Sequence, residues 1–372
     1  MKEINTFISD SLQKRILDNS YRTLKPENSL IDFCSNDYLG FSRSEELKNL
    51  FQTELKKQPE YHLGSGGSRL LAGNHSFTEQ LEHQIAIFHD SESALIYNSG
   101  FDANIGLFSS LPQRGDTIIS DEFIHASIID GIRLSHANRE VFRHNDLNNM
   151  EQKLKLAKGR IYVVVESVYS MDGDEAPLQD ILNLADKYNA AVIVDEAHAI
   201  GIFGASGKGL VYDLGLSTRV FSRIITFGKA LGTHGSAILG SSQLRSYLIN
   251  FSRSLIYTTA APFLNHLLIK CAYTYLKSWD HQSEIRKRID YFTKQVSPDL
   301  KLLKSHSAIQ IIVIPGNDKA REAAQLLQKN GFDIRAILSP SVAKGSERLR
   351  ICLHNHNSFE QIKNLCELLN HI

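Results

Sequence analysis

Residues 224–240 read Ile224-Ile-Thr-Phe-Gly-Lys-Ala-Leu-Gly-Thr-His-Gly-Ser-Ala-Ile-Leu-Gly240 and place one lysine, Lys229, directly after a β-rich run. The run from Arg223 to Phe227 predicts a strand, and Gly228 lets the backbone approach a ligand closely. The glycines that follow argue against a solvated helix around Lys229. A lysine that does covalent chemistry must be held neutral and aimed, so this stretch predicts a functional lysine at a strand end.

A second stretch, Ala191-Val-Ile-Val-Asp-Glu-Ala-His198, lies upstream and predicts a buried strand that ends in Asp195, with His198 three residues later. An acid at one strand end and a lysine on the next loop can grip the two ends of a pyridine ring. Pyridoxal 5'-phosphate (PLP) needs both, because the lysine forms a Schiff base and the carboxylate keeps the ring nitrogen protonated. Together, the two stretches predict a PLP site.

The composition narrows the class of protein. The chain has 372 residues, 42% of them apolar, with 41 basic and 41 acidic side chains. We expect a substantial core and two domains, and neither nucleic-acid nor membrane binding. Four scattered cysteines without CxxC spacing indicate reduced thiols. With no apolar leader or membrane-length run, we expect a cytoplasmic protein.

Strand and helix signals alternate along most of the chain, which predicts an α/β fold with a mostly parallel central sheet covered by helices. We expect an N-terminal segment over 1–40, a large domain over 41–280 and a smaller C-terminal α/β domain over 281–372. The expected strands lie at 30–34, 94–97, 117–120, 160–166, 191–195, 223–227, 309–314, 334–337 and 348–352. The expected helices lie at 3–17, 77–88, 100–111, 125–134, 178–188, 244–251, 263–279, 284–295, 319–329 and 358–369.

Further candidates follow other strands, where open α/β sheets bind ligands. Backbone N–H groups of Gly100 and Phe101 open a helix and would suit a phosphate, although an ordinary helix cap explains the same residues. His125 could stack on an aromatic cofactor or simply start a helix. Ser170 could contact the ring or phosphate, or belong to an Asp- and Gly-rich turn.

Two other groups are weaker. The loop Gly64–Arg69 could approach a ligand and Arg69 could meet an anion, but a flexible turn is the alternative. His354 and His356 have no third ligand nearby in the sequence, so we interpret them as surface residues. We therefore expect no metal site.

The chain resembles the α-oxoamine synthases, a family of PLP enzymes of fold type I, from about Ser35 to His354. The matching stretches are Ser35-Asn-Asp-Tyr-Leu-Gly40, Gly64-Ser-Gly-Gly-Ser-Arg69, Asn98-Ser-Gly-Phe101, His125-Ala-Ser127, Ser170-Met-Asp-Gly-Asp174, Val194-Asp-Glu-Ala-His198, Thr226-Phe-Gly-Lys229 and Arg348-Leu-Arg350. Several ungapped motifs in the family's order make the resemblance specific.

The resemblance implies a role for each matching residue. Lys229 would carry the cofactor, Asp195 would pair with the pyridine nitrogen, and His125 would stack on the ring. The remaining cofactor contacts would come from His198 and Ser170 near the ring hydroxyl, from Gly100, Phe101 and Thr226 at the phosphate, and from Thr258. Because Tyr257–Thr259 resembles a segment that reaches the partner subunit's site, we expect a homodimer with shared sites.

The resemblance also implies a reaction. Asn36 and Arg350 would grip an amino-acid carboxylate, while Arg22, Ser68 and Ser341 are candidates for contacts with the second substrate. The expected activity is a decarboxylating condensation of L-alanine with a pimeloyl thioester, carried by coenzyme A or acyl carrier protein, in biotin biosynthesis. The alternatives are a ligase joining glycine to acetyl-CoA, an aminotransferase, or a PLP-fold protein without turnover.

Overall fold

The computed structural model describes residues 1–18, 20–24, 26, 28–58 and 60–372. Its internal contacts separate two compact units, Met1–Leu30 and Ile31–Ile372. The first unit contains helix α1 (Lys2–Leu17), which confirms the helix expected over 3–17. The polar connector expected after it includes positions 25 and 27, which lie outside the described residues. The expected domain boundaries near 40 and 280 remain predictions.

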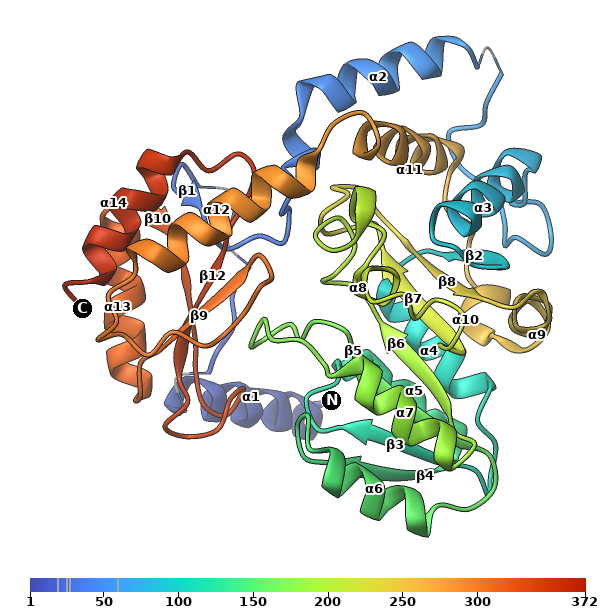
Figure 1. The fold of residues 1–372 in the computed structure, drawn as a ribbon, viewed down its shortest axis with the longest axis horizontal. Coiled ribbons are helices and arrows are strands. Elements are labelled where there is room, and N and C mark those ends of the chain that lie inside the picture. Colours follow the sequence, from blue (N-terminus) through green and yellow to red (C-terminus); the bar gives the residue numbers. More distant parts are fainter. Residues whose placement is uncertain (19, 25, 27, 59) are drawn as a thin grey trace. The chain divides into compact units, whose positions relative to one another are not determined.

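The second unit is built around a seven-stranded sheet in the order β2-β8-β7-β6-β5-β3-β4 (Figure 1). The strands are β2 (Ser93–Tyr97), β3 (Thr117–Asp121), β4 (Asn138–Phe142), β5 (Ile161–Glu166), β6 (Ala191–Asp195), β7 (Ser222–Thr226) and β8 (Ser236–Gly240). Neighbours pair in parallel except at β8, which is antiparallel to both β2 and β7. The predicted mostly parallel sheet is therefore confirmed.

Both faces of this sheet are buried, because successive strand residues point to opposite sides. In β5, Val163 and Val165 belong to one apolar cluster and Tyr162 and Val164 to another. Helices α3 (Ser76–Phe88), α6 (Leu147–Leu156) and α7 (Leu178–Lys187) contribute to the first cluster, and α4 (Gly100–Ser110) and α5 (Ala126–Ser135) to the second. Each fully buried aliphatic side chain stabilises the fold by roughly 1.5–3 kcal/mol.

Helices α4 and α5 approach each other closely at Gly131. A Cβ atom there would lie 2.8 Å from Cβ of Phe108 and 2.9 Å from the carbonyl oxygen of Asn104. A larger residue would push the two helices apart. The contact therefore fixes α4 and α5, whose N-terminal ends face the carboxyl ends of the strands.

The last part of the chain carries a three-stranded antiparallel sheet in the order β11-β12-β9. Its elements are α12 (His281–Gln295), β9 (Ile309–Val313), α13 (Asn317–Lys329), β11 (Arg335–Ile337), β12 (Arg348–Cys352) and α14 (Phe359–Leu369). The short strand β1 (Ile31–Asp32) pairs in parallel with β10 (Phe332–Asp333). This pairing brings the segment after β1 next to the end of β12.

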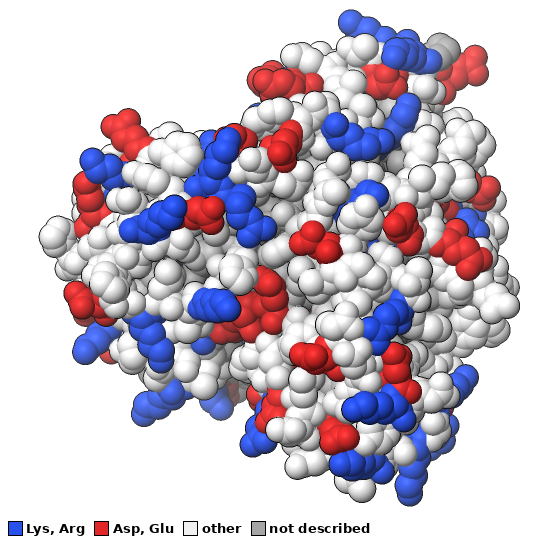
Figure 2. Space-filling model, viewed as in Figure 1, with Lys and Arg blue, Asp and Glu red and all other residues white. Residues whose placement is uncertain are grey.

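The remaining elements are η1 (Phe41–Arg43), α2 (Glu45–Lys56), η2 (Ala205–Gly207), α8 (Leu210–Asp213), α9 (Ser242–Phe251), α10 (Arg253–Ile256) and α11 (Phe263–Leu276). No helix in the described part of the chain combines the length and apolar character that crossing a membrane requires. On the face shown in Figure 2, basic and acidic side chains are interspersed. That face offers no extended basic surface of the kind that binds nucleic acid.

Candidate active site

Lys229 lies where the sequence predicts it, three residues after the end of β7. The N–H of Gly228 donates to the Thr226 hydroxyl at 3.3 Å, and the N–H of Gly232 donates to the Lys229 carbonyl at 2.9 Å. The half-buried amine has its pKa lowered to about 8, because burial outweighs the opposing charges of Asp195 and Glu166. A lysine with this pKa is partly neutral near physiological pH and can act as a nucleophile or base.

A hydrogen-bonded chain leads from Lys229 toward the first residues of the second unit. Nζ of Lys229 lies 2.8 Å from Nε2 of His198, and Nδ1 of His198 lies 2.7 Å from the Tyr38 oxygen. The Tyr38 hydroxyl donates to Oδ1 of Asn36 at 3.1 Å. Because that hydroxyl proton is used on Asn36, Nδ1 of His198 carries the proton that donates to Tyr38, and Nε2 accepts from Lys229.

Asp195 ends β6 and is 6% exposed. Its Oδ2 accepts from the side-chain amide of Asn104 at 3.0 Å, and its Oδ1 accepts from the N–H of Ala197 at 3.0 Å. The same amide donates to the Ser127 hydroxyl, whose oxygen lies 2.6 Å from Nδ1 of His125. This network ties the acid to helices α4 and α5 and holds its carboxylate in one orientation.

His125 caps the N-terminus of α5 and does not lie within the helix. Its side chain is exposed, as a ring must be if it is to cover a planar ligand. The pKa of His125 is lowered, because surrounding protein removes water from part of the ring and the Lys229 charge disfavours a second cation. His125, Ser170 and Ser341 line one cavity of about 460 Å³, so the structure brings these three predicted residues together.

Arg350, on the middle strand β12, is held by acceptors from three segments. Its NH2 donates to Oδ1 of Asn36 at 3.0 Å, its Nε to the Ser170 carbonyl at 2.8 Å, and its NH1 to the Cys352 sulfur at 2.9 Å. These contacts fix the plane of the guanidinium, a group whose paired N–H donors match the two oxygens of a carboxylate. Asn36 and Arg350 are thus neighbours, as predicted.

The predicted phosphate residues also lie together. Gly100 begins α4, and a Cβ atom there would meet only Cβ of Thr226, at 3.9 Å. The side chain of Ser99 caps the N–H of Asp102, while the first two helical N–H groups lack intrahelical partners. The space beside Gly100 is therefore open and lined by donors, which suits an anion.

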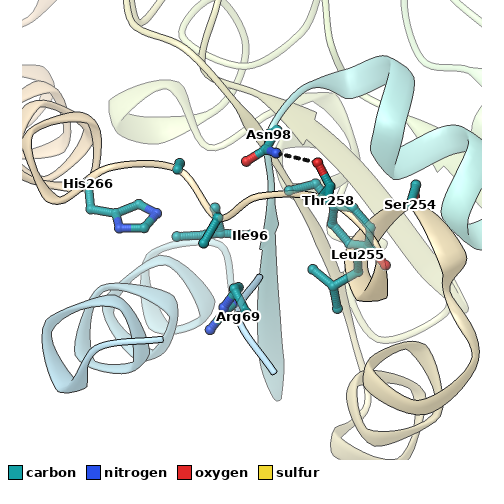
Figure 3. A pocket seen from close by; sticks show the side chains of 10 residues that line it. Arg69, Ile96, Asn98, Ser254, Leu255, Thr258 and His266 are labelled. Carbon is teal, nitrogen blue, oxygen red and sulfur yellow. Dashed lines mark hydrogen bonds between the residues drawn. The ribbon is translucent and has the colours of Figure 1, made fainter. Parts of the chain in front are cut away.

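Thr258 lies beside this loop in the same chain. Figure 3 shows the side chains of Asn98 and Thr258 pointing toward each other, and Nδ2 of Asn98 donates to the Thr258 hydroxyl at 3.0 Å. The pocket drawn there has a volume of about 10 Å³. It holds at most one water-sized molecule, so it is not a substrate site. Whether Thr258 also serves a partner's site stays a prediction.

Two other residues were predicted to contact the second substrate. Arg22 belongs to the unit Met1–Leu30, and its role stays a prediction. Ser68 lies in a turn in which its carbonyl accepts from Gly73 at 2.9 Å, and its role likewise stays a prediction. The neighbouring Arg69, considered as an anion ligand, is instead paired with Glu82.

The interpretation of His354 as a surface residue is wrong, whereas His356 keeps part of its surface exposed. His354 is fully buried and its Nε2 lies 3.0 Å from the Ser35 carbonyl, while both ring nitrogens of His356 are buried without a partner among the described residues. Asp32 lies with them, with ligand atoms within 4.8 Å of one another. The Asp32 carboxylate already accepts from Ser35 and from the Arg43 guanidinium, which would repel a cation.

These residues fit pyridoxal phosphate. Asp195 offers an oriented anion to a ring nitrogen, Lys229 offers an amine of lowered pKa, and His125 offers a flat exposed ring. The space at Gly100 and Gly228 is free of side chains within about 3.5 Å, as a phosphate and its linkage require. The donor set therefore matches both ends of the cofactor.

Sequence reasoning assigned no role to four residues of the site. Tyr38 and Ser127 stand inside the quoted motifs and Asn104 lies three residues beyond one, but their contacts join segments far apart in the chain. Glu166 lies beside Asp195 at the end of β5. A signal for Glu166 was present, because an acid that ends a strand of consecutive apolar residues is unusual in a buried sheet.

Comparison with known proteins identifies the family. The model of "Aminotransferase class I and II" matches residues 28–369. The chain is 40% identical to an 8-amino-7-oxononanoate synthase of Emericella nidulans, over 93% of this chain and 90% of that protein. It is 35% identical to one of Alkaliphilus oremlandii, over 94% and 89%. An aminoacyl transferase, sphA, of Byssochlamys spectabilis is 37% identical, over 92% and 81%.

Comparison with solved structures supports the same family. The 8-amino-7-oxononanoate synthase of Francisella tularensis has a TM-score of 0.79 at 28% identity, covering 93% of this chain and 98% of that one. A serine palmitoyltransferase of Sphingomonas wittichii has a TM-score of 0.87 at 25% identity, covering 99% and 96%. The chain belongs to the class I and II aminotransferase family, within which it is an α-oxoamine synthase of the PLP-dependent transferase fold.

Proposed function

We propose that this enzyme condenses L-alanine with a pimeloyl thioester, releasing CO2 and the thiol to form 8-amino-7-oxononanoate in biotin biosynthesis. The observation that carries the proposal is the joining of two half-sites: the Lys229–Asp195 pair, which fits PLP, and the Asn36–Arg350 pair, which fits a carboxylate. Relatives that cover most of the chain bear the name of this synthase. When bound, PLP supplies an electron sink for negative charge at the amino acid's Cα.

The chain's own residues would carry out substrate binding and proton transfer. Arg350 and Asn36 bind the alanine carboxylate, and the neutral Lys229 amine removes the Cα proton. The alanine Cα then bonds to the thioester carbonyl carbon, and the C–S bond breaks to release a thiolate, which takes a proton from water. Loss of the alanine carboxylate as CO2 follows, and Lys229 returns a proton to Cα. Asp195 would hold a proton on the ring nitrogen of bound PLP, and His125 would cover the ring and keep water out.

The second substrate would enter through the cavity that His125, Ser170 and Ser341 line. Its volume of about 460 Å³ exceeds what an acetyl group needs. Ser341 is our candidate for contact with the far end of the acyl chain, and Arg22 and Ser68 are further candidates. The carrier is coenzyme A or acyl carrier protein. We also propose a cytoplasmic homodimer with sites shared between subunits.

The deciding experiment measures thiol release with alanine or glycine against acyl-CoAs from acetyl to pimeloyl. We expect the highest kcat/KM with alanine and pimeloyl-CoA. One methyl changes binding by only about 1–3 kcal/mol, so the preference over glycine should be clear but finite. Highest kcat/KM with glycine and acetyl-CoA would replace the proposal with a glycine ligase.

A chemical label tests the cofactor lysine. Borohydride reduction of the PLP-loaded protein, followed by peptide mapping, should place the pyridoxyl group on Lys229. Lys229→Ala should lose both the label and turnover, whereas Lys277→Ala, at an exposed lysine beyond α11, should keep both. A label that persists in the Lys229 variant would assign the cofactor to another lysine.

A further inference from the structure

Two carboxylates lie side by side at the carboxyl ends of neighbouring strands. Glu166 of β5 and Asp195 of β6 are partners in the parallel register, so both side chains point to the same face of the sheet. They are 3% and 6% exposed. Because adjacent strands lie about 4.8 Å apart, the two side chains are neighbours, and two negative charges on neighbouring groups away from water disfavour each other. One of the two groups is therefore expected to hold a proton.

The hydrogen bonds of the two carboxyl groups indicate which of them holds the proton. Asp195 accepts from Asn104 and from the N–H of Ala197, each at 3.0 Å, and both bonds favour its anion. The backbone N–H groups of His125 and Ser170 also favour the anion of Glu166, but its Oε1 is buried without a hydrogen-bond partner among the described residues. Each carboxylate oxygen of Asp195 therefore has a donor, whereas one oxygen of Glu166 has none, so the anion of Glu166 is the less well compensated of the two. The proton therefore belongs on Glu166.

The charges around Glu166 come from several elements. Lys229 after β7 favours its anion, Asp195 opposes it, and the buried Tyr169 hydroxyl lies close enough for Glu166 to raise the pKa of that phenol. Arg350 of β12 acts on Lys229 and disfavours its ammonium form. Burial, followed by the Asp195 charge, raises the pKa of Glu166 to about 8, close to that of Lys229.

We propose that Glu166 is a positioning residue: it holds a proton on its buried carboxyl group, so that Asp195 is the one anion at the strand ends and Lys229 releases its proton near neutral pH. The inference rests on the proposed role of Lys229 and Asp195 and adds a control on their charge. If Glu166 ionised at lower pH, its charge would hold the proton on Lys229 and compete with Asp195 for the positive end of the ring. Glu166 acts through these two residues and needs no contact with substrate.

The test uses cofactor-free protein and the substitution Glu166→Gln, which mimics the protonated carboxyl group. The reactivity of Lys229 toward a limiting amount of acetic anhydride is followed from about pH 6 to about pH 10 by mass spectrometry of its peptide. In wild-type protein, ionisation of Glu166 as the pH passes 8 should hold protons on Lys229 and broaden its titration. The variant should titrate as a single group with a lower midpoint, and should react about threefold faster at pH 8. Identical profiles would overturn the proposal.

Glu196→Gln is the matched control. Glu196 is fully buried on the next residue after Asp195, but its carboxylate faces Arg223 at 3.6 Å and the N–H of Val211. Its loss should reduce stability and leave the Lys229 profile unchanged. If the Lys229 profile shifts as much in Glu196→Gln as in Glu166→Gln, the effect reflects a general disturbance of the fold. That result would overturn the proposal.

If Glu166→Gln fails to fold, a second measurement tests whether Glu166 holds a proton. Wild-type protein labelled with ¹³C at glutamate carboxyl carbons should show one carboxyl group that titrates above about pH 7 and titrates still higher in Lys229→Ala, because the ammonium that favours its anion is gone. Absence of such a signal would contradict the proposal. Neither measurement involves the acyl substrate, so failure here would leave the proposed condensation standing.

Discussion

The amine of Lys229 lies 2.8 Å from Nε2 of His198, and the same imidazole is anchored through Nδ1 to Tyr38 at 2.7 Å. Burial, followed by the Lys229 charge, holds the pKa of His198 well below its usual range, so the ring is neutral. A neutral imidazole accepts a hydrogen bond from the lysine without repelling it. His198 therefore aims Lys229, and Tyr38 fixes the ring that does so.

Removing the Tyr38 hydroxyl should weaken catalysis while leaving the fold intact. Tyr38→Phe keeps the buried ring but deprives His198 of its anchor, so we expect kcat to fall about tenfold, with a smaller change in the KM for alanine. Tyr247→Phe is the control, because its hydroxyl donates to the Ser110 carbonyl at the C-terminal end of α4. Equal kcat in the Tyr38 variant and wild type would remove Tyr38 from the site.

Covalent capture of PLP by cofactor-free protein should depend on pH through Lys229. The pKa of Lys229 is lowered from 10.5 to about 8, so the reactive neutral fraction grows about tenfold per pH unit below that value and levels off above it. Stopped-flow absorbance, with borohydride trapping as an endpoint, measures the rate. A rate that keeps rising to about pH 10 would show an ordinary, solvated lysine.

Asp195→Asn should separate cofactor binding from turnover. The amide keeps the size of the side chain, but a neutral group cannot hold a proton on the ring nitrogen. We therefore expect substantial PLP binding with kcat reduced on the order of 100-fold or more. Cofactor content and steady-state rates are measured on the same preparation. Near-normal kcat would contradict the proposed role of Asp195.

Sites shared across a homodimer predict complementation between two inactive variants. Lys229→Ala and an inactive Thr258 variant, unfolded together and refolded as a mixture, should regain up to about one quarter of wild-type activity, because half the dimers are hybrids with one intact site of two. Each variant refolded alone is the control. No recovery, in a mixture shown by native mass spectrometry to contain hybrids, would place both residues in one subunit's site.

His144 should stabilise the fold in a pH-dependent way. It lies 3.1 Å from Asp121 and 2.8 Å from Asp174, and although burial lowers its pKa, hydrogen bonds to both carboxylates raise it to about 10. Because the folded pKa exceeds the unfolded value of 6.5, this stabilisation is full below about pH 6.5 and is lost as the pH rises through about 10.

Urea unfolding of His144→Gln provides the measurement. The variant should lose about 2 kcal/mol near pH 6 and much less near pH 10. His136→Asn, at an exposed position with φ of 60°, serves as the control, since asparagine tolerates that conformation. A loss for His144→Gln that does not change with pH would mean that His144 is not charged in the fold.

Local signals were enough to predict most of the fold. The run at 191–195 matches β6, because consecutive apolar residues mark a strand buried on both faces, and the strand expected at 348–352 matches β12. Strand β4 was missed, since its sequence Asn138-Arg-Glu-Val-Phe142 is polar and it lies at the sheet edge. Helix α2 was also missed, although Ser44 caps it and acids fill its first turn.

Lys229, Asp195 and Arg350 could be predicted from the motifs, because their residue types suit the binding of a cofactor and of a carboxylate. The motifs could not name the partners of these residues. The contacts of Asp195 with Asn104 and of His198 with Tyr38 span 91 and 160 positions, and no local pattern encodes such pairs. His354 was misjudged for the same reason, because the buried ring contacts the Ser35 carbonyl, 319 positions away, and the sequence does not reveal that contact.

The bond between Asn36 and Arg350 joins positions 314 residues apart. During synthesis, the segments that carry Asp195 and Lys229 leave the ribosome well before Arg350 does. A growing chain could therefore assemble its cofactor site early, yet it could not hold an amino-acid carboxylate until β12 had emerged and paired. A chain truncated before β12 would contain Lys229 but lack Arg350, so it could not bind the amino-acid carboxylate. The order of translation therefore delays activity until β12 has been made.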